Sequence, residues 1–321
     1  MKKIKFDKFL KKIKSKFQFD YNIKKLNWFN IGGEAKAFFK PDNLNELSLF
    51  LKEFGHEEKI FVLGAGSNIL LNDSSFKGVV IKLGKNFSNI SLLQNNIIVA
   101  GSATTDKKLS EFAMVNEIGG FEFLSCIPGT VGGGIKINSG CYGKEFKDIL
   151  ISIQVIDKRG QIKTIPKSDI NFGYRESNLN MDYIFLSASF KGTPKKRDLI
   201  EKEIKFLKEK KEKTQPSKIK TGGSTFKNPK KQTSEKVWKL IERSVPKDIN
   251  FGDAEISEKH SNFLINKGNA SFEDMLKLIN FINKTTFQHN ALTHEISFPR
   301  VHNHTHSYSH HGLSQPRSLQ M

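Results

Sequence analysis

Cysteine is scarce in this sequence: Cys126 and Cys141 are the only two among 321 residues. Two cysteines cannot form the disulfide framework of a small secreted domain, so we expect a reducing compartment. No segment approaches the roughly 20 consecutive apolar residues that cross a bilayer. The first ten residues interleave charges with single apolar side chains instead of forming the apolar stretch of a signal peptide. The sequence therefore predicts a cytoplasmic protein without membrane insertion.

Acidic residues are outnumbered as well. Lys and Arg total 52 against 33 for Asp and Glu, which gives a formal net charge of +19. This excess would attract polyanions, acidic membranes or small anionic substrates. A lysine-rich genome would give the same value, because the lysines are spread along the whole chain. A nucleic-acid-binding protein also needs a recognisable motif or aromatic residues interleaved on one face. We find neither and expect no nucleic-acid partner.

The length suits two domains that share a cleft. Strand-like apolar runs alternate with turns and amphipathic helices, so an α+β fold is predicted. Strands are expected at 59–63, 78–83, 96–100, 151–156 and 262–266, with a loop at 252–257. Helices are expected at 4–17, from Asn43 onward, between 196 and 220, around Trp238, and at 272–279 behind the N-cap pair Ser271 and Asp274.

The two ends of the chain have unusual compositions. A helix over 4–17 would carry an apolar face and a lysine face, which suits a membrane surface or ordinary packing against the protein. We favour packing. After Val301, five histidines lie among Asn, Ser and Thr without an arranged carboxylate or cysteine. We therefore predict a disordered tail and no metal site.

Two glycine-rich loops are the main local signal: the first glycine loop at 63–68 (LGAGSN) and the second glycine loop at 126–134 (CIPGTVGGG). A serine turn follows at 222–229 (GGSTFKNP). Glycine lets the backbone approach an anionic ligand and point several N–H groups at it, which suits a diphosphate. The first loop is not the dinucleotide fingerprint, because the apolar segment 69–71 follows it instead of a helix. A flavoenzyme with a different nucleotide-binding fold is indicated.

Further motifs give the chain a specific resemblance. They are FNIGGEA at 29–35, the span 127–143, GYRES at 173–177, GSTFKNP at 223–229 and SEKHSNF at 257–263. In this order they resemble the UDP-N-acetylenolpyruvoylglucosamine reductase family. The resemblance implies a two-part FAD-binding domain of the p-cresol methylhydroxylase and vanillyl-alcohol oxidase type with a smaller α+β substrate-binding domain. The short interval between Arg175 and Ser224 is similar to the second type of the family.

The resemblance also implies an activity: reduction of UDP-N-acetylenolpyruvoylglucosamine to UDP-N-acetylmuramate in peptidoglycan synthesis. It implies noncovalent FAD, NADPH as hydride donor, and a monomer. The expected division is a basic helix at 1–26, the FAD-binding domain at 27–193, the substrate-binding domain at 194–300 and the tail at 301–321. The implied FAD contacts are Gly64, Ala65, Gly66, Ser67, Asn68, Ile127, Pro128, Gly129, Thr130, Gly132, Gly133, Asn138, Gly140 and Tyr142.

The chemistry of the implied reaction assigns roles to further residues. Reduction of an enolpyruvyl ether puts hydride on one alkene carbon and a proton on its neighbour, while negative charge spreads onto the carboxylate. An arginine can hold that carboxylate through a planar fork, and the resemblance gives this role to Arg175. It makes Ser224 the proton donor, although a serine beside glycine more commonly bonds its own backbone. It makes Glu295 the acid near the enol, and it places the substrate against Tyr174, Lys227 and Asn228.

One alternative stays open at this point: an oxidase of the same fold that acts on another substrate. Such oxidases often tether flavin to a histidine or cysteine, and the glycine loops offer only Cys126 and the nearby Cys141. We interpret Cys141 as a small packing residue, because no second cysteine is spaced for exchange with it.

Overall fold

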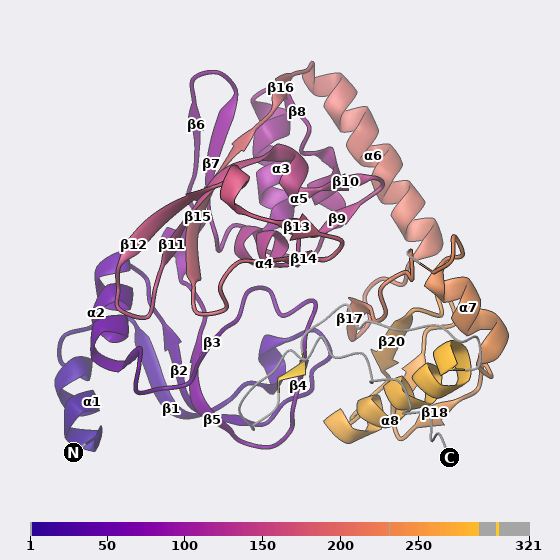
Figure 1. Ribbon diagram of the computed structural model, residues 1–321, viewed down its shortest axis with the longest axis horizontal. Coiled ribbons are helices and arrows are strands. Elements are labelled where there is room, and N and C mark those ends of the chain that lie inside the picture. Colours follow the sequence, from indigo (N-terminus) through magenta and orange to yellow (C-terminus); the bar gives the residue numbers. More distant parts are fainter. Residues whose placement is uncertain (1, 231, 289–299, 302–321) are drawn as a thin grey trace, which may run out of the picture.

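The computed structural model describes residues 2–230, 232–288 and 300–301. Within them, three larger sheets each carry their own helices (Figure 1). Parallel and antiparallel pairs occur together with helices along the chain, so the predicted α+β class is confirmed. No helix in this part of the chain is both long and apolar enough to cross a membrane.

The first sheet consists of β1 (Lys16–Asn22), β2 (Glu34–Lys40), β5 (Phe76–Ile81) and β3 (Ile60–Val62), in the order β1-β2-β5-β3. β1 is antiparallel to β2, whereas β2, β5 and β3 run parallel. α1 (Lys2–Leu10) and α2 (Leu44–Phe54) pack against this sheet in a core rich in phenylalanine. α2 begins where predicted, because the side chain of Asn43 accepts the N–H of Glu46 at 2.9 Å.

The N-terminal helix is shorter than predicted. It ends at Leu10 instead of 17, and β1 begins at Lys16. The Glu46 carboxylate accepts the N–H groups of Lys14 and Ser15, which holds this connection to the start of α2. From Phe17 onward, aromatic residues recur at every second position, the period of a strand. Phe6 and Phe9 are buried in the core, so the expected packing of this helix is confirmed.

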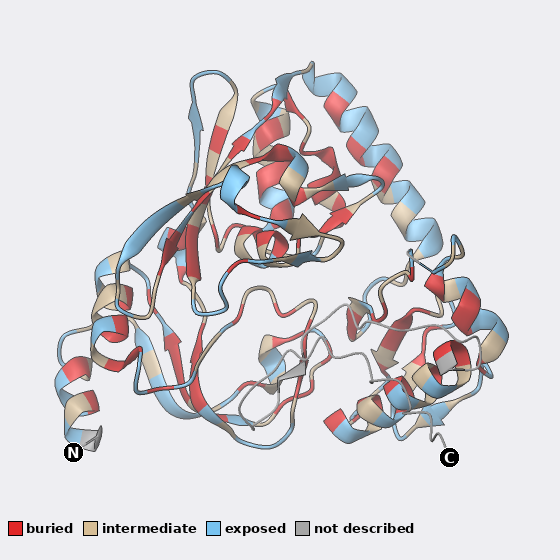
Figure 2. Ribbon diagram, in the orientation of Figure 1, coloured by how far each residue is buried: buried red, intermediate tan, exposed pale blue. Residues whose placement is uncertain are grey.

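The second sheet consists of β12 (Ile162–Pro166), β11 (Leu150–Ile156), β15 (Ile184–Lys191), β7 (Ile97–Gly101) and β6 (Ile90–Leu93), in that order. All of its pairs are antiparallel. Its core also contains side chains from α3 (Asp106–Val115), η3 (Glu122–Cys126), α4 (Val131–Lys136) and α5 (Phe146–Ile149). Figure 2 shows buried residues on β11, β15 and β7 beside these helices, with which they share a core.

The third sheet consists of β17 (Thr221–Ser224), β20 (Phe263–Asn266), β19 (Ala254–Ile256) and β18 (Asn250–Phe251), with α7 (Val237–Ser244), α8 (Phe272–Ile282) and η5 (Asn283–Gln288). The predicted loop at 252–257 contains β19, because Ala254 and Ile256 point into the core. α8 begins with the predicted capping box of Ser271 and Asp274. Phe29 and Ile31 join this core from the N-terminal part of the chain.

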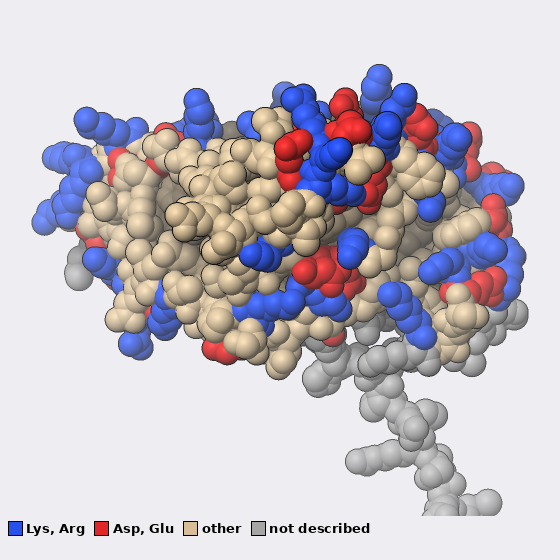
Figure 3. Space-filling view, turned by 90° about the horizontal axis from the view of Figure 1, so that it is seen from above, with Lys and Arg blue, Asp and Glu red and all other residues tan. Residues whose placement is uncertain are grey.

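A single long helix, α6 (Arg197–Thr214), connects the part of the chain built on the second sheet, the second unit, to the part built on the third sheet, the third unit (Figure 1). The lysine-rich composition of this segment predicted a helix here. Ile200, Ile204 and Leu207 are its buried residues, and most of its lysines are exposed. On the face drawn in Figure 3, basic side chains are interspersed with acidic ones and do not form a continuous stripe.

The remaining elements are short. They are η1 (Lys24–Leu26), β4 (Leu70–Leu71), η2 (Lys85–Ser88), β8 (Ile118–Gly119), β9 (Gly140–Cys141), β10 (Lys144–Glu145), η4 (Lys167–Asp169), β13 (Phe172–Gly173), β14 (Glu176–Ser177), β16 (Thr193–Pro194) and β21 (Arg300–Val301). Val301, the first residue of the predicted tail, belongs to β21 and pairs with Leu71 of β4. The other residues of that tail, 302–321, lie outside the described residues.

Candidate functional site

The two glycine loops meet in the structure although they follow different elements. The first loop follows β3, and the second runs from η3 into α4. A Cβ added to Gly64 would lie 2.6 Å from the hydroxyl oxygen of Thr130, closer than Cβ atoms approach other atoms in proteins. Only glycine therefore fits at this contact, and the two predicted FAD loops line one region.

Close packing and hydrogen bonds fix the position of the first glycine loop. Gly66 has a φ of +69°, and a Cβ there would lie 2.2 Å from the carbonyl oxygen of Leu26. The Gly66 carbonyl accepts the N–H of Trp28 at 2.9 Å, and Lys82 donates to the Gly64 carbonyl. Burial, followed by the neighbouring Lys40, lowers the pKa of Lys82. Ala65, Ser67 and Asn68 are half-buried in the same loop.

The second glycine loop pairs with the segment before α3. The N–H groups of Val131 and Gly132 donate to the carbonyls of Thr104 and Ser102, both at 2.9 Å. Gly132 therefore contributes close backbone approach at this site, since its N–H is already used within the protein. The other predicted contacts in this loop are half-buried or exposed: Ile127, Pro128, Gly129, Thr130 and Gly133.

A buried polar cluster beside this loop escaped the sequence analysis. Asp106 is fully buried, and neither of its carboxylate oxygens has a hydrogen-bond partner among the described residues. The buried hydroxyls of Thr104 and Ser110 are likewise unpaired there. A Cβ on Gly129 would lie 2.5 Å from Asp106 Oδ2, so this carboxyl group directly underlies the loop. Burial raises the pKa of Asp106 well above its ordinary value, which favours the neutral acid.

The serine turn lies next to the first glycine loop. Gly223 has a φ of +79°, and a Cβ there would be 4.0 Å from the Ser67 carbonyl oxygen. Its neighbour Gly222 has no room for a Cβ, because the ring of Phe29 would be 2.3 Å away. Ser224 follows at the end of β17 and is exposed. The fold thus brings the predicted proton donor to the rim of the first loop.

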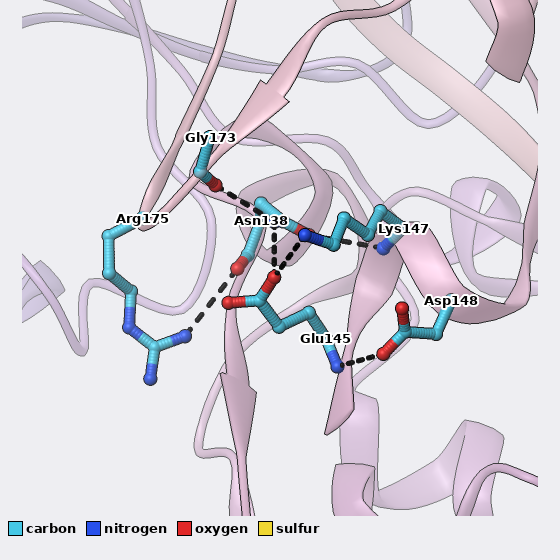
Figure 4. A network of polar contacts seen from close by, with 6 residues as sticks. All are labelled: Asn138, Glu145, Lys147, Asp148, Gly173 and Arg175. Atoms are coloured by element: carbon cyan, nitrogen blue, oxygen red, sulfur yellow. Dashed lines mark hydrogen bonds and ion pairs between the residues drawn. The ribbon is translucent and has the colours of Figure 1, made fainter. Parts of the chain in front are cut away.

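Arg175 is held by a network of polar contacts around Asn138 (Figure 4). It lies between β13 and β14 and donates to the carbonyls of Gly140 and Asn138. The fully buried Asn138 side chain donates to Glu145 and to the Gly173 carbonyl, both at 3.0 Å. The predicted contacts Asn138 and Gly140 are therefore joined to the predicted carboxylate-binding arginine.

Positive φ values gather in this network. Asn138, Tyr142 and Arg175 have φ of +43°, +53° and +61°. These conformations are uncommon for residues other than glycine and concentrate at functional sites. Tyr142 is exposed, with the Lys210 ammonium 5.0 Å from its ring centroid.

The predicted substrate residues come together across the boundary between the second and third units. The Asn228 amide donates to the Tyr174 hydroxyl at 3.0 Å. Lys227 lies 3.5 Å from the Glu176 carboxylate, and the Lys230 ammonium is 3.8 Å from the Tyr174 ring centroid. This leaves one predicted residue unplaced: Glu295 lies outside the described residues.

Comparisons with known proteins identify the families and relatives that this chain resembles. A family described as FAD binding domain matches residues 35–166, and a family described as UDP-N-acetylenolpyruvoylglucosamine reductase, C-terminal domain, matches residues 215–298. A UDP-N-acetylenolpyruvoylglucosamine reductase of Pelagibacter ubique is 66% identical over 86% of this chain and 91% of its own length. One from Rickettsia bellii is 42% identical over 87% of this chain and 92% of its own.

A solved structure is also similar. The crystal structure of UDP-N-acetylenolpyruvylglucosamine reductase from Thermus caldophilus superposes with a TM-score of 0.76 at 27% identity. The match covers 89% of this chain and 98% of that one, so the two chains share one fold.

Proposed function

The chain belongs to the UDP-N-acetylenolpyruvoylglucosamine reductase family, and we propose on that basis that it reduces the enolpyruvyl group of UDP-N-acetylenolpyruvoylglucosamine with NADPH. The product is UDP-N-acetylmuramate, a precursor for peptidoglycan, and the cofactor is noncovalent FAD. The observation that carries the proposal is the meeting of the three loops, at Gly64 with Thr130 and at Gly223 with Ser67. An oxidase acting on another substrate is not favoured, because the relatives are named reductases. The monomeric state and the cytoplasmic location stay predictions.

The residues present fit FAD. Gly64 and Gly66 let the first glycine loop pack directly against Thr130 and Leu26, where any side chain would collide. A glycine-rich backbone of this kind can point N–H groups at a diphosphate. Beneath the second loop, burial raises the pKa of Asp106 well above its ordinary value, which favours an uncharged carboxyl group beside a diphosphate. The chemistry that bound FAD would supply is hydride transfer from NADPH to the alkene.

Arg175 is the proposed partner of the substrate carboxylate. Its guanidinium stays charged at any working pH and presents a planar fork that matches a carboxylate. The carbonyls of Gly140 and Asn138 hold part of that fork in place, which restricts the side chain before substrate arrives. As negative charge spreads onto the carboxylate during reduction, the interaction strengthens, and this is where the arginine would lower the barrier.

Ser224 is the proposed proton donor. It is exposed at the end of β17, one residue after Gly223, whose close approach to Ser67 sets it beside the first loop. Its hydroxyl would give a proton to the alkene carbon next to the one that takes hydride. A positioned donor of this kind typically contributes about 10² to 10⁴-fold to a rate.

Lys227, Asn228 and Tyr174 would bind the diphosphate and sugar of the substrate. Tyr174 lies in the second unit and the other two lie in the third, so a substrate held by all three would contact both units. Glu295 stays the proposed acid near the enol, on the resemblance alone.

An anaerobic flavin experiment tests the proposed function. The purified protein should show a flavin spectrum that bleaches when NADPH is added. Addition of UDP-N-acetylenolpyruvoylglucosamine should then restore the oxidised spectrum without oxygen. Recovery only when air is admitted would support an oxidase instead, and absence of flavin after addition of FAD would refute both.

A further inference from the structure

Residues 27–33, which link η1 to β2, contact two of the three site loops, and we call this segment the strap. The N–H of Trp28 donates to the Gly66 carbonyl in the first glycine loop at 2.9 Å. The ring of the next residue, Phe29, packs against Gly222 of the serine turn, where an added Cβ would lie 2.3 Å from a ring carbon. Two consecutive residues of the strap therefore join the loop proposed for flavin to the turn that carries the proposed proton donor.

Hydrogen bonds fix the backbone on which the Phe29 ring stands. The Asn27 side chain donates to the carbonyls of Lys24 and Ile31 at 3.1 and 2.7 Å, which closes the strap into a compact turn. The buried Asn266 side chain, at the end of β20, donates to the Phe29 carbonyl at 2.8 Å. The position of Phe29 is therefore fixed by its own segment and by β20 of the third unit.

A carboxylate joins the far end of the strap to α8. Asp73 accepts the N–H of Gly32 at 3.1 Å through one oxygen and the N–H of Phe272 at 2.5 Å through the other. Phe272 is the first residue of α8, so a negative charge on Asp73 lies at the N-terminus of that helix, where it is favourable. The strap is therefore attached to the third unit at two points, directly at Phe29 and through Asp73 at Gly32.

A bulge in β17 precedes Ser224. The pairing of β17 with β20 shifts register between Thr221 and Ser224, because β17 contains one residue more than its partner over this stretch. Bulges interrupt the ladder and re-aim side chains, and they are common next to active sites. The irregular stretch consists of Gly222 and Gly223, and Gly223 has a φ of +79°. The direction of the Ser224 side chain therefore depends on the contacts that keep this bulge in place.

We propose that Phe29 is a positioning residue that sets the Ser224 hydroxyl relative to the flavin. Its ring packs against the bulge at Gly222, and Trp28, one residue earlier, bonds to the first glycine loop. The proposed reaction adds a hydride and a proton to neighbouring carbons of one alkene, so the hydride donor and the proton donor must keep a fixed separation. A misplacement of about 1 Å can cost about 10²-fold in rate. This role rests on the proposed function.

The contact between Phe29 and Gly222 allows a compensation test. The φ of Gly222 lies outside the left-handed region, so its backbone does not require glycine. The three atoms nearest to an added Cβ are Cε2, Cζ and Cδ2 of the Phe29 ring, at 2.3, 3.0 and 3.1 Å. Leucine has no counterparts of Cε2 and Cζ. Phe29→Leu therefore makes room for Gly222→Ala, and the two substitutions should show a strong interaction.

Anaerobic stopped-flow kinetics of Gly222→Ala, Phe29→Leu and the double variant test the role. In Gly222→Ala, reoxidation by the enolpyruvyl substrate should slow about tenfold or more, because the turn must move away from the ring. The solvent deuterium isotope effect on reoxidation should rise, since a displaced hydroxyl impairs proton delivery. Reduction by NADPH and bound flavin should not change. The double variant should be reoxidised faster than Gly222→Ala, because the added methyl group occupies space that the ring has left.

Urea unfolding of the full-length protein supplies a readout that needs no activity. Gly192→Ala is the matched control, because an added Cβ there would lie 2.2 Å from the Ile118 side chain and 2.7 Å from the Phe121 ring, outside the three site loops. Both glycine variants should unfold at lower urea concentration than the wild type. Only the midpoint of Gly222→Ala should recover when Phe29→Leu is added, and only Gly222→Ala should alter reoxidation. Equal slowing of reoxidation in Gly192→Ala would assign the effect to general destabilisation and overturn the role.

A double variant no faster than Gly222→Ala, or equal slowing of both half-reactions, would also overturn the role. Should Gly222→Ala fail to fold, Phe29→Leu alone decides. It should slow reoxidation and raise the isotope effect, because the bulge loses its support, and wild-type values of both would overturn the role. A wild type that the substrate does not reoxidise would refute the proposed function instead, and the urea midpoints would still report the contact between Phe29 and Gly222.

Discussion

The Asn228 side-chain amide donates to the Tyr174 hydroxyl at 3.0 Å, and this bond joins the serine turn to the hairpin that carries Arg175. Ser224 lies four residues before Asn228, and Arg175 follows Tyr174 directly. The segments that carry Ser224 and Arg175 are therefore joined by this hydrogen bond. We expect loss of the bond to weaken substrate binding.

Tyr174→Phe removes that bond and keeps the ring under Lys230. A net hydrogen bond is worth about 0.5–1.5 kcal/mol, so the KM for the enolpyruvyl substrate should rise about 2- to 10-fold. Flavin reduction by NADPH should not change. Steady-state kinetics of Tyr174→Phe beside Tyr183→Phe, a tyrosine whose ring contacts Lys163 elsewhere, checks this. An equal rise in both variants, or none in Tyr174→Phe, would contradict the role.

Gly66→Ala should abolish flavin retention. Its φ of +69° disfavours alanine, and the new Cβ would collide with the Leu26 carbonyl, so the first glycine loop must move. Gly143→Ala is the matched control, because Gly143 also has a positive φ, +86°, but open space around its Cβ position. Bound flavin per folded protein should fall sharply only in Gly66→Ala. Equal flavin content in the two variants would refute the assignment of this loop.

Asp106→Asn should stabilise the flavin-free protein above pH 4. The pKa of Asp106 is raised in the folded state, so the folded protein binds a proton that the unfolded chain has lost. Stability therefore falls as pH rises above the unfolded value, by at most about 1.4 kcal/mol per pH unit. Asn does not ionise and escapes this loss. Urea unfolding at pH 4 and pH 8 measures the free energy of unfolding of both proteins. The difference between variant and wild type should shift in favour of the variant at pH 8. The same difference at both pH values would contradict a raised pKa.

Much of this molecule is predictable from local sequence, and the exceptions have tertiary causes. α2 and α8 begin where Asn43 and Ser271 cap them, because capping depends on a few adjacent residues. The end of α1 at Leu10 could not be predicted, since it depends on Glu46, which is distant in the sequence. The three site loops could be recognised from their glycines, but their meeting depends on how the sheets pack.

Two features of the site could be found only from the structure. The raised pKa of Asp106 comes from burial, and no residue near it in the sequence signals that burial. The positive φ of Arg175 could not be expected from the sequence, because the residue at this position is neither glycine nor asparagine.

Arg175→Lys should slow reoxidation by substrate much more than reduction by NADPH. Lysine keeps the charge but loses the planar fork, and it cannot reproduce the contacts to both Gly140 and Asn138. We expect the reoxidation rate to fall by at least tenfold at saturating substrate. Stopped-flow measurement of the two half-reactions separates them. Equal slowing of both, with unchanged flavin content, would assign Arg175 to a different role.

Ser224→Ala tests the central assignment most directly, by anaerobic stopped-flow on NADPH-reduced enzyme mixed with UDP-N-acetylenolpyruvoylglucosamine. Ser224 is exposed at the rim of the first glycine loop, and the substitution removes only its hydroxyl. Because only reoxidation needs the proton, its rate should fall about 10² to 10⁴-fold while reduction by NADPH stays nearly unchanged. Ser224→Cys should recover part of the loss, since a thiol can still donate a proton. Reoxidation of Ser224→Ala at the wild-type rate would contradict Ser224 as the proton donor.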